Sequence, residues 1–215
     1  MTYIVLEGTD GQGKTTLINN LKRLKPDWKY VHEPWSSIYI DKITKANYED
    51  VSYLFARDRE LLIRTEVIDA IRMGKVVISD RSVFSSYAYQ TVYQMDKEYL
   101  FNTIHECENK IICNNENRMI EIIKDIVGIQ PRSIPEPHII YLCGNVEQAL
   151  KRSSDNEIIS LQRIKKIEYV YNYILFNDLP FLFPKIKHLT TISDPENYSA
   201  QDLIASIYAK NTDIK

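Results

Sequence analysis

The sequence predicts an α/β fold in which a five-stranded parallel sheet is flanked by helices. Short apolar runs recur along the 215-residue chain, and most are followed by a segment whose apolar residues have helical spacing. Repeated strand–helix units of this kind imply parallel strands joined by right-handed crossovers. The length and the 44% apolar content suit one globular unit, so we expect a single domain over residues 1–215.

The expected elements follow from these patterns. Strands are expected at residues 3–6, 28–32, 76–78, 139–143 and 188–192. Helices are expected after Lys14 to residue 24 and at residues 48–73, 85–94, 146–152, 161–176 and 198–209, with one or two peripheral helices between residues 96 and 126. The second strand must end near Glu33 because Pro34 cannot continue a central strand.

The stretch Gly8–Thr16 fits the phosphate-binding P-loop pattern, and it lies between an expected strand and an expected helix, as the motif requires. Its glycines let backbone N–H groups point at phosphate oxygens, and the helix N-terminus adds partial positive charge. Lys14 is expected to reach the β- and γ-phosphates of ATP, and the Thr15 hydroxyl to ligate Mg²⁺. The predicted nucleotide-binding residues are Gly8, Asp10, Gly11, Gln12, Gly13, Lys14, Thr15 and Thr16.

Two acidic residues lie where expected strands end. Asp80 follows the strand at 76–78, and an acid at this position of a P-loop protein is a candidate Mg²⁺ ligand. Glu33 lies at the carboxyl end of the second strand, the edge at which open α/β sheets bind ligands. A helix-capping role for Glu33 is an equally open alternative.

Composition excludes several classes of protein. The net charge of −2 gives no sign of a surface that coats nucleic acid. Cys107, Cys113 and Cys143 have neither close pairing nor metal-ligand spacing, which is typical of reduced thiols in a cytosol-like compartment. No apolar run reaches membrane-spanning length. We therefore expect a cytoplasmic protein, or one in the host cytoplasm if it is viral, that binds neither nucleic acid nor membrane.

Several segments, in the same order along the chain, resemble motifs of the thymidylate kinases. They are Leu6–Thr16, Leu54–Arg59, Ser79–Gln90, and Pro137–Leu142 continuing through Ala149–Arg152. The resemblance extends over residues 3 to about 175. It implies a P-loop NTPase fold with a short lid at about residues 152–160. It also implies a homodimeric enzyme that uses ATP and Mg²⁺ to convert dTMP to dTDP.

The resemblance implies a role for each matching residue. Asp10 would contact the sugar 3′-hydroxyl, Phe55 would stack on the thymine, and Arg59 and Gln90 would hydrogen-bond the base edge. Arg81 would bind the acceptor phosphate, Asp80 would help to hold Mg²⁺, and Arg152 would begin the lid over ATP. The predicted catalytic residues are therefore Asp10, Lys14, Asp80, Arg81 and Arg152, and the predicted acceptor-binding residues are Asp10, Glu33, Phe55, Arg59, Arg81, Ser82, Ser85 and Gln90.

Three positions depart from the family pattern. His32 replaces the arginine before Glu-Pro, so one phosphate contact is lost or comes from elsewhere. Ser82 replaces a tyrosine beside the sugar, which weakens the steric objection to a ribose 2′-hydroxyl, and its own hydroxyl could bond to that group. Members of the family that have no arginine in the P-loop usually have one in the lid. Here Gln12 occupies the P-loop position, and the lid between Arg152 and Arg163 contains no arginine. Transition-state charge must then fall to Arg152, Arg163 or a nearby lysine.

Alternatives remain open at the level of function and of single residues. Glu33–Pro34 and Asp80–Ser82 also resemble deoxynucleoside kinases, and a kinase for another or a modified deoxynucleoside monophosphate is a further alternative. A non-catalytic nucleotide-binding switch is the rival from another class, although a switch has no need of the retained acceptor positions. Phe55 could be ordinary core packing. Arg57 and Arg59 cannot share one helix face, so only one of them, Arg59, is expected in the site.

Overall fold

The computed structural model describes residues 2–46, 48–99, 137–152, 161–179, 186 and 188–212. Five parallel strands form one sheet in the order β2-β3-β1-β4-β5, which confirms the expected architecture. The strands are β1 (Tyr3–Glu7), β2 (Lys29–His32), β3 (Val77–Asp80), β4 (His138–Leu142) and β5 (Leu189–Ile192). Each begins and ends within two residues of its predicted position.

The helices are α1 (Lys14–Leu24), α2 (Ser37–Lys45), α3 (Tyr48–Leu62), α4 (Ile68–Arg72), α5 (Val83–Tyr99), α7 (Val146–Arg152), α8 (Leu161–Tyr173) and α10 (Ala200–Thr212). The long helix expected at 48–73 is α3 and α4 joined by a π-helical turn, η1 (Ile63–Val67). A second such turn, η2 (Ile174–Asp178), ends α8. Helix α2 was not predicted; none of its residues is buried, although it carries the apolar residues Ile38, Tyr39, Ile40 and Ile43. The expected lid beyond Arg152 and the segment 100–126 lie outside the described residues.

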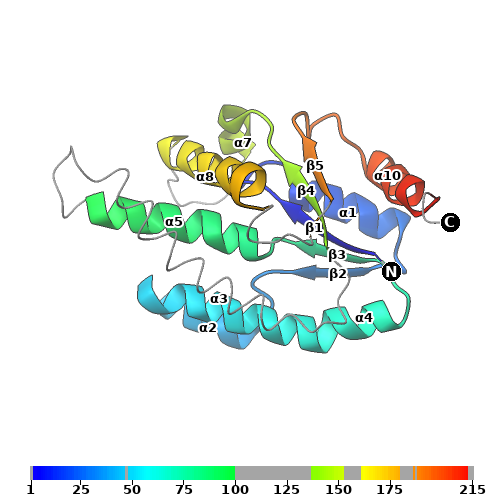
Figure 1. Cartoon of the computed structure of the whole chain (residues 1–215), viewed down its shortest axis with the longest axis horizontal. Coiled ribbons are helices and arrows are strands. Elements are labelled where there is room, and N and C mark those ends of the chain that lie inside the picture. Colours follow the sequence, from blue (N-terminus) through cyan, green and yellow to red (C-terminus); the bar gives the residue numbers. More distant parts are fainter. Residues whose placement is uncertain are drawn as a thin grey trace.

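The sheet is the middle of three layers (Figure 1). Side chains alternate between its two faces along each strand. In β1, Ile4 and Leu6 pack with α1 and α10, whereas Tyr3 and Val5 pack with η1 and α4. Beside them, α5 and α8 cover the same face as α4 and pack on Ile139 of β4.

The carboxyl ends of the three adjacent strands β2, β3 and β1 are level. Leu6 in β1 and His32 in β2 both pair with Asp80 at the end of β3. The chain continues this alignment past the strands, since the Glu33 amide donates to the Asp80 carbonyl (3.0 Å) and the Arg81 amide to the Leu6 carbonyl (3.0 Å). The P-loop and these residues are thereby brought to one edge of the sheet.

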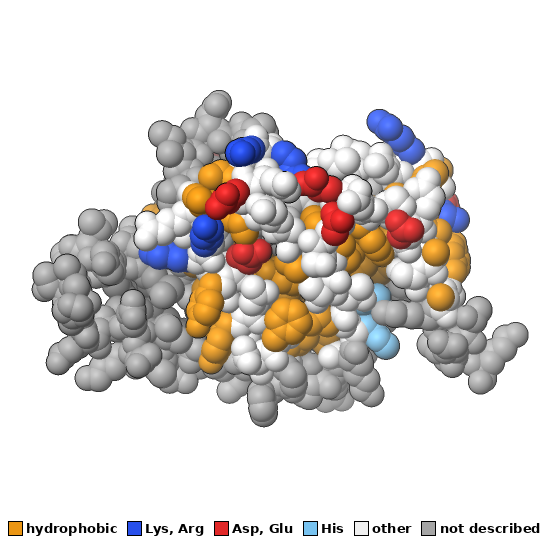
Figure 2. All heavy atoms as spheres, turned by 90° about the horizontal axis from the view of Figure 1, so that it is seen from above, with side chains coloured by type: hydrophobic (Ala, Val, Ile, Leu, Met, Phe, Trp, Pro, Cys, Tyr) orange, Lys and Arg blue, Asp and Glu red, His pale blue; other side chains and the backbone are white. Residues whose placement is uncertain are grey.

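The surface carries charges of both signs. On the face seen in Figure 2, basic and acidic side chains are interspersed among polar and apolar ones. Among the described helices, none combines the length and the apolar character needed to span a membrane.

Candidate functional site

The P-loop closes tightly on neighbouring backbone, and two of its glycines leave no room for a side chain. A Cβ atom on Gly8, whose φ is 140°, would lie 2.4 Å from the Leu142 carbonyl oxygen. On Gly11, whose φ is 78°, it would lie 1.9 Å from the Ala149 carbonyl oxygen. Residues with a side chain also rarely adopt such φ values. The loop is therefore held directly against the end of β4 and against α7.

Lys14 is buried and folds back over the loop. Its Nζ donates hydrogen bonds to the carbonyl oxygens of Gly8 (2.7 Å) and Thr9 (2.8 Å). Burial, with a smaller contribution from the positive charge of Arg81, lowers the pKa of Lys14 to about 7. A polyphosphate in the loop would offer this amine anionic acceptors in place of neutral ones and would favour its protonated form.

A cavity of about 320 Å³, which we name the P-loop pocket, opens between α1 and the segment after β5. Its lining includes Gln12, Gly13, Thr16, Arg152, Pro195 and Asn197. The Gln12 side chain pairs with the backbone of Gly144, donating from Nε2 to the carbonyl (3.0 Å) and accepting from the amide at Oε1 (2.9 Å). Arg152 forms an ion pair with Glu196 across the lining. The predicted residues Gln12 and Arg152 thus lie at one pocket, each already engaged.

A larger cavity of about 570 Å³ lies between α3 and α5, and we name it the α3–α5 pocket. Of the predicted acceptor-binding residues, those that line it are Glu33, Phe55, Arg81, Ser82, Ser85 and Gln90. The other two, Asp10 and Arg59, are joined to lining residues by ion pairs. Tyr93 and Arg163 also line this pocket, and the Arg163 guanidinium lies 5.8 Å from the Tyr93 ring centroid. The structure therefore gathers the predicted acceptor residues around one cavity.

Asp10, Arg81 and Tyr89 form a closed triangle of polar contacts. Arg81 Nη2 forms an ion pair with Asp10 Oδ1 and donates to the Tyr89 hydroxyl (3.3 Å). That hydroxyl donates in turn to Asp10 Oδ2 (2.8 Å). Both carboxylate oxygens of Asp10, the predicted partner of a sugar hydroxyl, are therefore engaged within the protein.

The backbone of Arg81 is held in an unusual conformation. Its φ of 75° lies in the left-handed region, which is uncommon for a residue with a side chain. The Arg81 amide donates to Leu6, and its carbonyl accepts from Ser79 Oγ (2.9 Å). This conformation sends the guanidinium toward α5 and the P-loop, where Nη1 donates to Ser85 Oγ (3.2 Å) and, more weakly, to the Gly8 carbonyl (3.5 Å).

Glu7, the last residue of β1, is fully buried with 0% exposure. Its Oε1 accepts from the Ser82 hydroxyl (2.5 Å), and its Oε2 accepts from the hydroxyls of Ser85 (2.6 Å) and Tyr171 (3.0 Å). Burial and the Glu7 carboxylate raise the pKa of Tyr171 well above its ordinary value, so the phenol stays a donor. The Ser82 hydroxyl, which the sequence suggested as a partner for a sugar, donates instead to Glu7.

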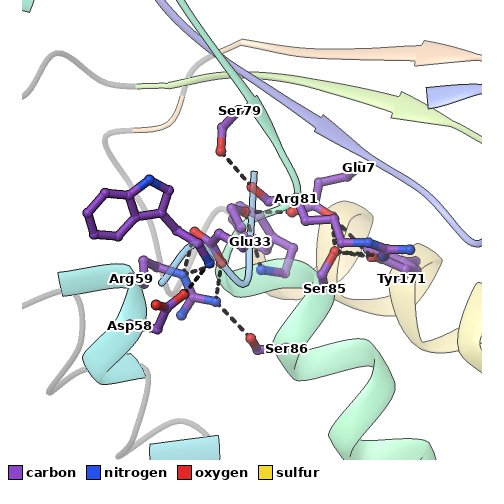
Figure 3. Close-up of polar contacts among 12 residues, drawn as sticks. Glu7, Glu33, Asp58, Arg59, Ser79, Arg81, Ser85, Ser86 and Tyr171 are labelled. Atoms are coloured by element: carbon purple, nitrogen blue, oxygen red, sulfur yellow. Dashed lines mark hydrogen bonds and ion pairs between the residues drawn. The ribbon is translucent and has the colours of Figure 1, made fainter. Parts of the chain in front are cut away.

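Glu33 and Arg59 form a second buried cluster, which lies to the left of Glu7, Ser85 and Tyr171 in Figure 3. Arg59 Nε lies 2.9 and 2.8 Å from the two Glu33 carboxylate oxygens, and Nη2 lies 2.6 Å from Oε2. Nη2 also donates to Ser86 Oγ (2.7 Å), whereas Nη1 is buried without a hydrogen-bond partner in the described part of the chain. Burial raises the pKa of Glu33 to about 6, although the Arg59 charge acts in the opposite direction. Arg57, by contrast, is exposed and pairs with Glu60.

Sequence reasoning missed three residues of this site. Glu7 had a usable signal, because an acid directly after an apolar run must be paired if the strand is buried. Tyr89 lies inside the recognised segment Ser79–Gln90 but was given no role. Tyr171 carried no signal beyond helical spacing, since its contact with Glu7 joins residues 164 positions apart.

The geometry is compatible with a nucleotide-borne Mg²⁺. Asp80 Oδ1 is buried and has no hydrogen-bond partner within the described ranges, so it can accept a cation. Thr15 is the second residue of α1 and is exposed at the loop. Among the described residues, no three His, Cys, Asp or Glu side chains cluster as an independent metal site. Mg²⁺ often takes only one or two protein ligands and completes its shell with water and substrate phosphates, which fits this donor set.

Comparisons with known proteins agree with this geometry. Residues 6–106 match a family model described as thymidylate kinase. A probable thymidylate kinase of Archaeoglobus fulgidus is 34% identical over 180 residues, which cover 78% of this chain and 89% of that protein. This chain belongs to the thymidylate kinase family. The thymidylate kinase of Mycoplasma genitalium is 32% identical over 155 residues, covering 57% of this chain and 74% of that protein.

The match to other thymidylate kinases is more local. With a probable thymidylate kinase of Staphylothermus marinus, the identity is 37% over 99 residues, which cover 41% of this chain and 49% of that protein, so the chain spans about half of its length. The solved structure of thymidylate kinase from Candida albicans superposes with a TM-score of 0.66 at 18% identity, covering 97% of this chain and 89% of that one. That likeness establishes the fold, and it confirms the P-loop NTPase fold expected from the sequence.

Proposed function

We propose that this thymidylate kinase family member transfers the γ-phosphate of ATP to dTMP, giving ADP and dTDP. The observation that carries the proposal is the position of Arg81. Its side chain lines the α3–α5 pocket and also contacts Gly8 of the P-loop. An acceptor phosphate held by Arg81 would therefore lie next to the γ-phosphate of a nucleotide held by the loop.

On the donor side, the P-loop amides and Lys14 would bind the triphosphate of ATP. The P-loop pocket would take the rest of the donor nucleotide, with Gln12, Thr16 and Arg152 in its lining. Asp80 and Thr15 would hold Mg²⁺, which neutralises charge on the β- and γ-phosphates when bound. The aspartate fits this role because one of its oxygens is buried and unpaired within the described part of the chain.

On the acceptor side, Phe55 would stack on the pyrimidine, and Asp10 would turn from Arg81 to the sugar 3′-hydroxyl. Arg59 is not in the pocket lining and its Nη1 is buried, so the guanidinium would have to shift toward the pocket to donate to O4 of the base. Gln90 would offer both a donor and an acceptor to the ring. A 4-amino group would face the Arg59 donor unfavourably, so we expect dTMP and dUMP to be preferred over dCMP by roughly 10- to 100-fold.

The transfer needs no covalent enzyme intermediate. A phosphate oxygen of dTMP attacks the γ-phosphorus in line, and the bond to the β–γ bridging oxygen breaks as ADP leaves. Lys14, Arg81 and Arg152 or Arg163 would compensate the negative charge on the transferred group. Their contribution is positioning together with charge stabilisation at fixed donors.

The alternative of a nucleoside acceptor is less favoured by the geometry. A nucleoside hydroxyl needs a base to take its proton. Glu33 is the carboxylate that lines the α3–α5 pocket, and both of its oxygens are bonded to Arg59. A monophosphate acceptor is already ionised and needs no such base.

We also propose that the protein is a cytoplasmic homodimer, as the family resemblance implies. Helix α3 exposes the large apolar side chains of Tyr53 and Leu61, which are available for a contact of this kind. Sedimentation analysis of the purified protein should give the mass of a dimer. A monomer at micromolar concentration would contradict this part of the proposal.

The experiment that tests the proposed function is an acceptor panel. Purified protein with Mg·ATP is assayed against the common nucleosides and nucleoside monophosphates, and ADP release is followed. We expect dTMP to be the best acceptor. Turnover with nucleosides alone would assign the protein to the deoxynucleoside kinases, and no turnover with any acceptor would favour a nucleotide-binding switch.

A further inference from the structure

A buried carboxylate lies behind the acceptor arginine; it lines neither pocket itself, but it bonds to Ser82 and Ser85 of the α3–α5 pocket lining. Glu7 is fully buried at the end of β1, one residue before the P-loop. Three hydroxyl groups converge on it, from Ser82, Ser85 and Tyr171. Figure 3 shows Ser85 and Tyr171 beside Glu7. An ionised carboxylate only accepts hydrogen bonds, and three donors on two oxygens fit that requirement. Burying a charged carboxylate costs free energy, so we expect Glu7 to have a role.

Two of the three donors lead to Arg81. Ser85 donates to Glu7 and accepts from Arg81 Nη1 (3.2 Å), so one hydroxyl joins carboxylate and guanidinium. Ser82 is the residue after Arg81, and its bond to Glu7 fixes the chain where Arg81 has a φ of 75°. Glu7 therefore constrains both the side chain and the backbone of Arg81.

The third donor ties a distant helix to the same group. Tyr171 on α8 donates to Glu7 and lies 2.6 Å from Ser85 Oγ. Its ring also lies edge-on to that of Tyr89, at 6.4 Å between centroids, and Tyr89 contacts Arg81. Two groups that contact the Arg81 guanidinium, Ser85 and Tyr89, are thus linked to Glu7, directly or through Tyr171.

We propose that Glu7 is a positioning residue that aims Arg81 at the acceptor phosphate through Ser82 and Ser85. The inference rests on the proposed function, because it takes a phosphate monoester as the group that Arg81 meets. Fork-shaped donors bind phosphate oxygens best when two N–H groups are correctly directed, so a misdirected guanidinium loses phosphate affinity without losing its charge. Ser82 gives this chain a bond to Glu7 directly beside Arg81.

The test compares the binding of dTMP and thymidine, which differ only in the phosphate. Calorimetric titration of wild-type protein should give tighter binding of dTMP. In Glu7→Gln the ratio of the two affinities should fall by roughly tenfold or more, the loss expected when a charged hydrogen-bond network is broken. Thymidine affinity and the KM for ATP should stay within about twofold.

Matched tyrosine variants keep the test decisive if Glu7→Gln does not fold. Tyr171→Phe removes a donor to Glu7, and it should lower the dTMP/thymidine ratio by about threefold to tenfold. Tyr141→Phe removes the hydroxyl of a neighbouring, equally buried tyrosine, at 5.6 Å between ring centroids, that has no hydrogen-bond partner in the described structure. It should leave the ratio unchanged.

Each outcome separates the inference from the proposed function. A wild-type protein that binds thymidine as tightly as dTMP would overturn the proposed function. A wild-type preference for dTMP that persists in folded Glu7→Gln, or in Tyr171→Phe, would overturn the positioning role alone. If Glu7 had a purely structural role, Glu7→Gln would lower the melting temperature and weaken the binding of dTMP and thymidine equally. That result would also overturn the positioning role. A double-mutant cycle of Glu7→Gln with Ser85→Ala should be non-additive if Glu7 acts through Ser85.

Discussion

The two sides of the site are built in different ways. On the P-loop side, contacts with backbone atoms hold the structure in place. Gly8 and Gly11 pack on neighbouring carbonyls, and Lys14 is held by loop carbonyls. On the side of the α3–α5 pocket, the structure depends on charged side chains, namely the pairs Arg81–Asp10 and Glu33–Arg59. A backbone site is specified by a local motif, whereas a side-chain site depends on partners far apart in sequence. The two sides should therefore fail differently when single residues are changed.

Loss of the buried ion pair should have the largest effect on stability. Arg59→Ala leaves the Glu33 carboxylate buried without its partner, which typically costs about 3–5 kcal/mol in unfolding free energy. Arg57→Ala on the same helix removes only an exposed pair with Glu60 and should cost less than about 1 kcal/mol. Urea denaturation of both variants measures the difference. Equal small losses would show that the Glu33–Arg59 pair does not support this side of the site.

Lys14→Ala should separate catalysis from folding on the backbone side. The loop keeps its shape through glycines and backbone contacts, so the variant should fold with a melting temperature near that of the wild type. Removal of a donor aimed at developing charge typically lowers the rate by about 10²-fold or more. The measurement is kcat with Mg·ATP and dTMP. Turnover near the wild-type rate would reject the role of Lys14.

The lowered pKa of Lys14 predicts a proton-linked step in nucleotide binding. At pH 8 the amine of the free protein, with a pKa of about 7, is mostly neutral. Bound triphosphate favours the charged amine, so ATP binding at pH 8 should take up a proton, and ATP affinity should fall as pH rises above 7. Titrations in buffers of different ionisation enthalpy measure this uptake. Lys14→Arg, which stays charged, is the control and should show none; uptake that is equal in both proteins would contradict the prediction.

A smaller effect is expected at Gln12, a P-loop side chain that bonds to the remote backbone of Gly144. Gln12→Ala removes both bonds to Gly144, each worth about 1 kcal/mol. The KM for ATP should rise severalfold, because the wall of the P-loop pocket loses its link to the loop. The KM for dTMP should change little. A larger effect on dTMP than on ATP would show that the two sides are not independent.

The same contrast explains what the sequence could predict. The parallel sheet follows from repeated strand–helix units, and the P-loop from a contiguous motif whose residue types have a direct physical reason. Phe55 and Gln90 were predicted to bind the acceptor through resemblance rather than through periodicity, and both line the α3–α5 pocket. Helix α2 was not predicted, and none of its residues is buried.

The details of the side-chain networks could not be predicted in this way. Nothing local indicates that Arg59 pairs with Glu33 and not with solvent, since the pairing depends on how α3 packs beside the end of β2. Similarly, Ser82 donates to Glu7 because β1 and β3 are neighbours, although the two residues are 75 positions apart. Polar contacts between elements are decided by packing, and the sequence pattern of one element does not encode them.

The most direct test of the account is the effect of Arg81→Ala on the two substrates. In the proposed mechanism Arg81 binds the dianionic acceptor phosphate. Its loss should therefore raise the KM for dTMP steeply, by about tenfold or more, while the KM for ATP stays nearly unchanged. Initial rates measured over a grid of both substrate concentrations give the two constants in one experiment. An equal rise in both constants, or a rise for ATP alone, would assign Arg81 to the donor phosphates and contradict the acceptor site described above.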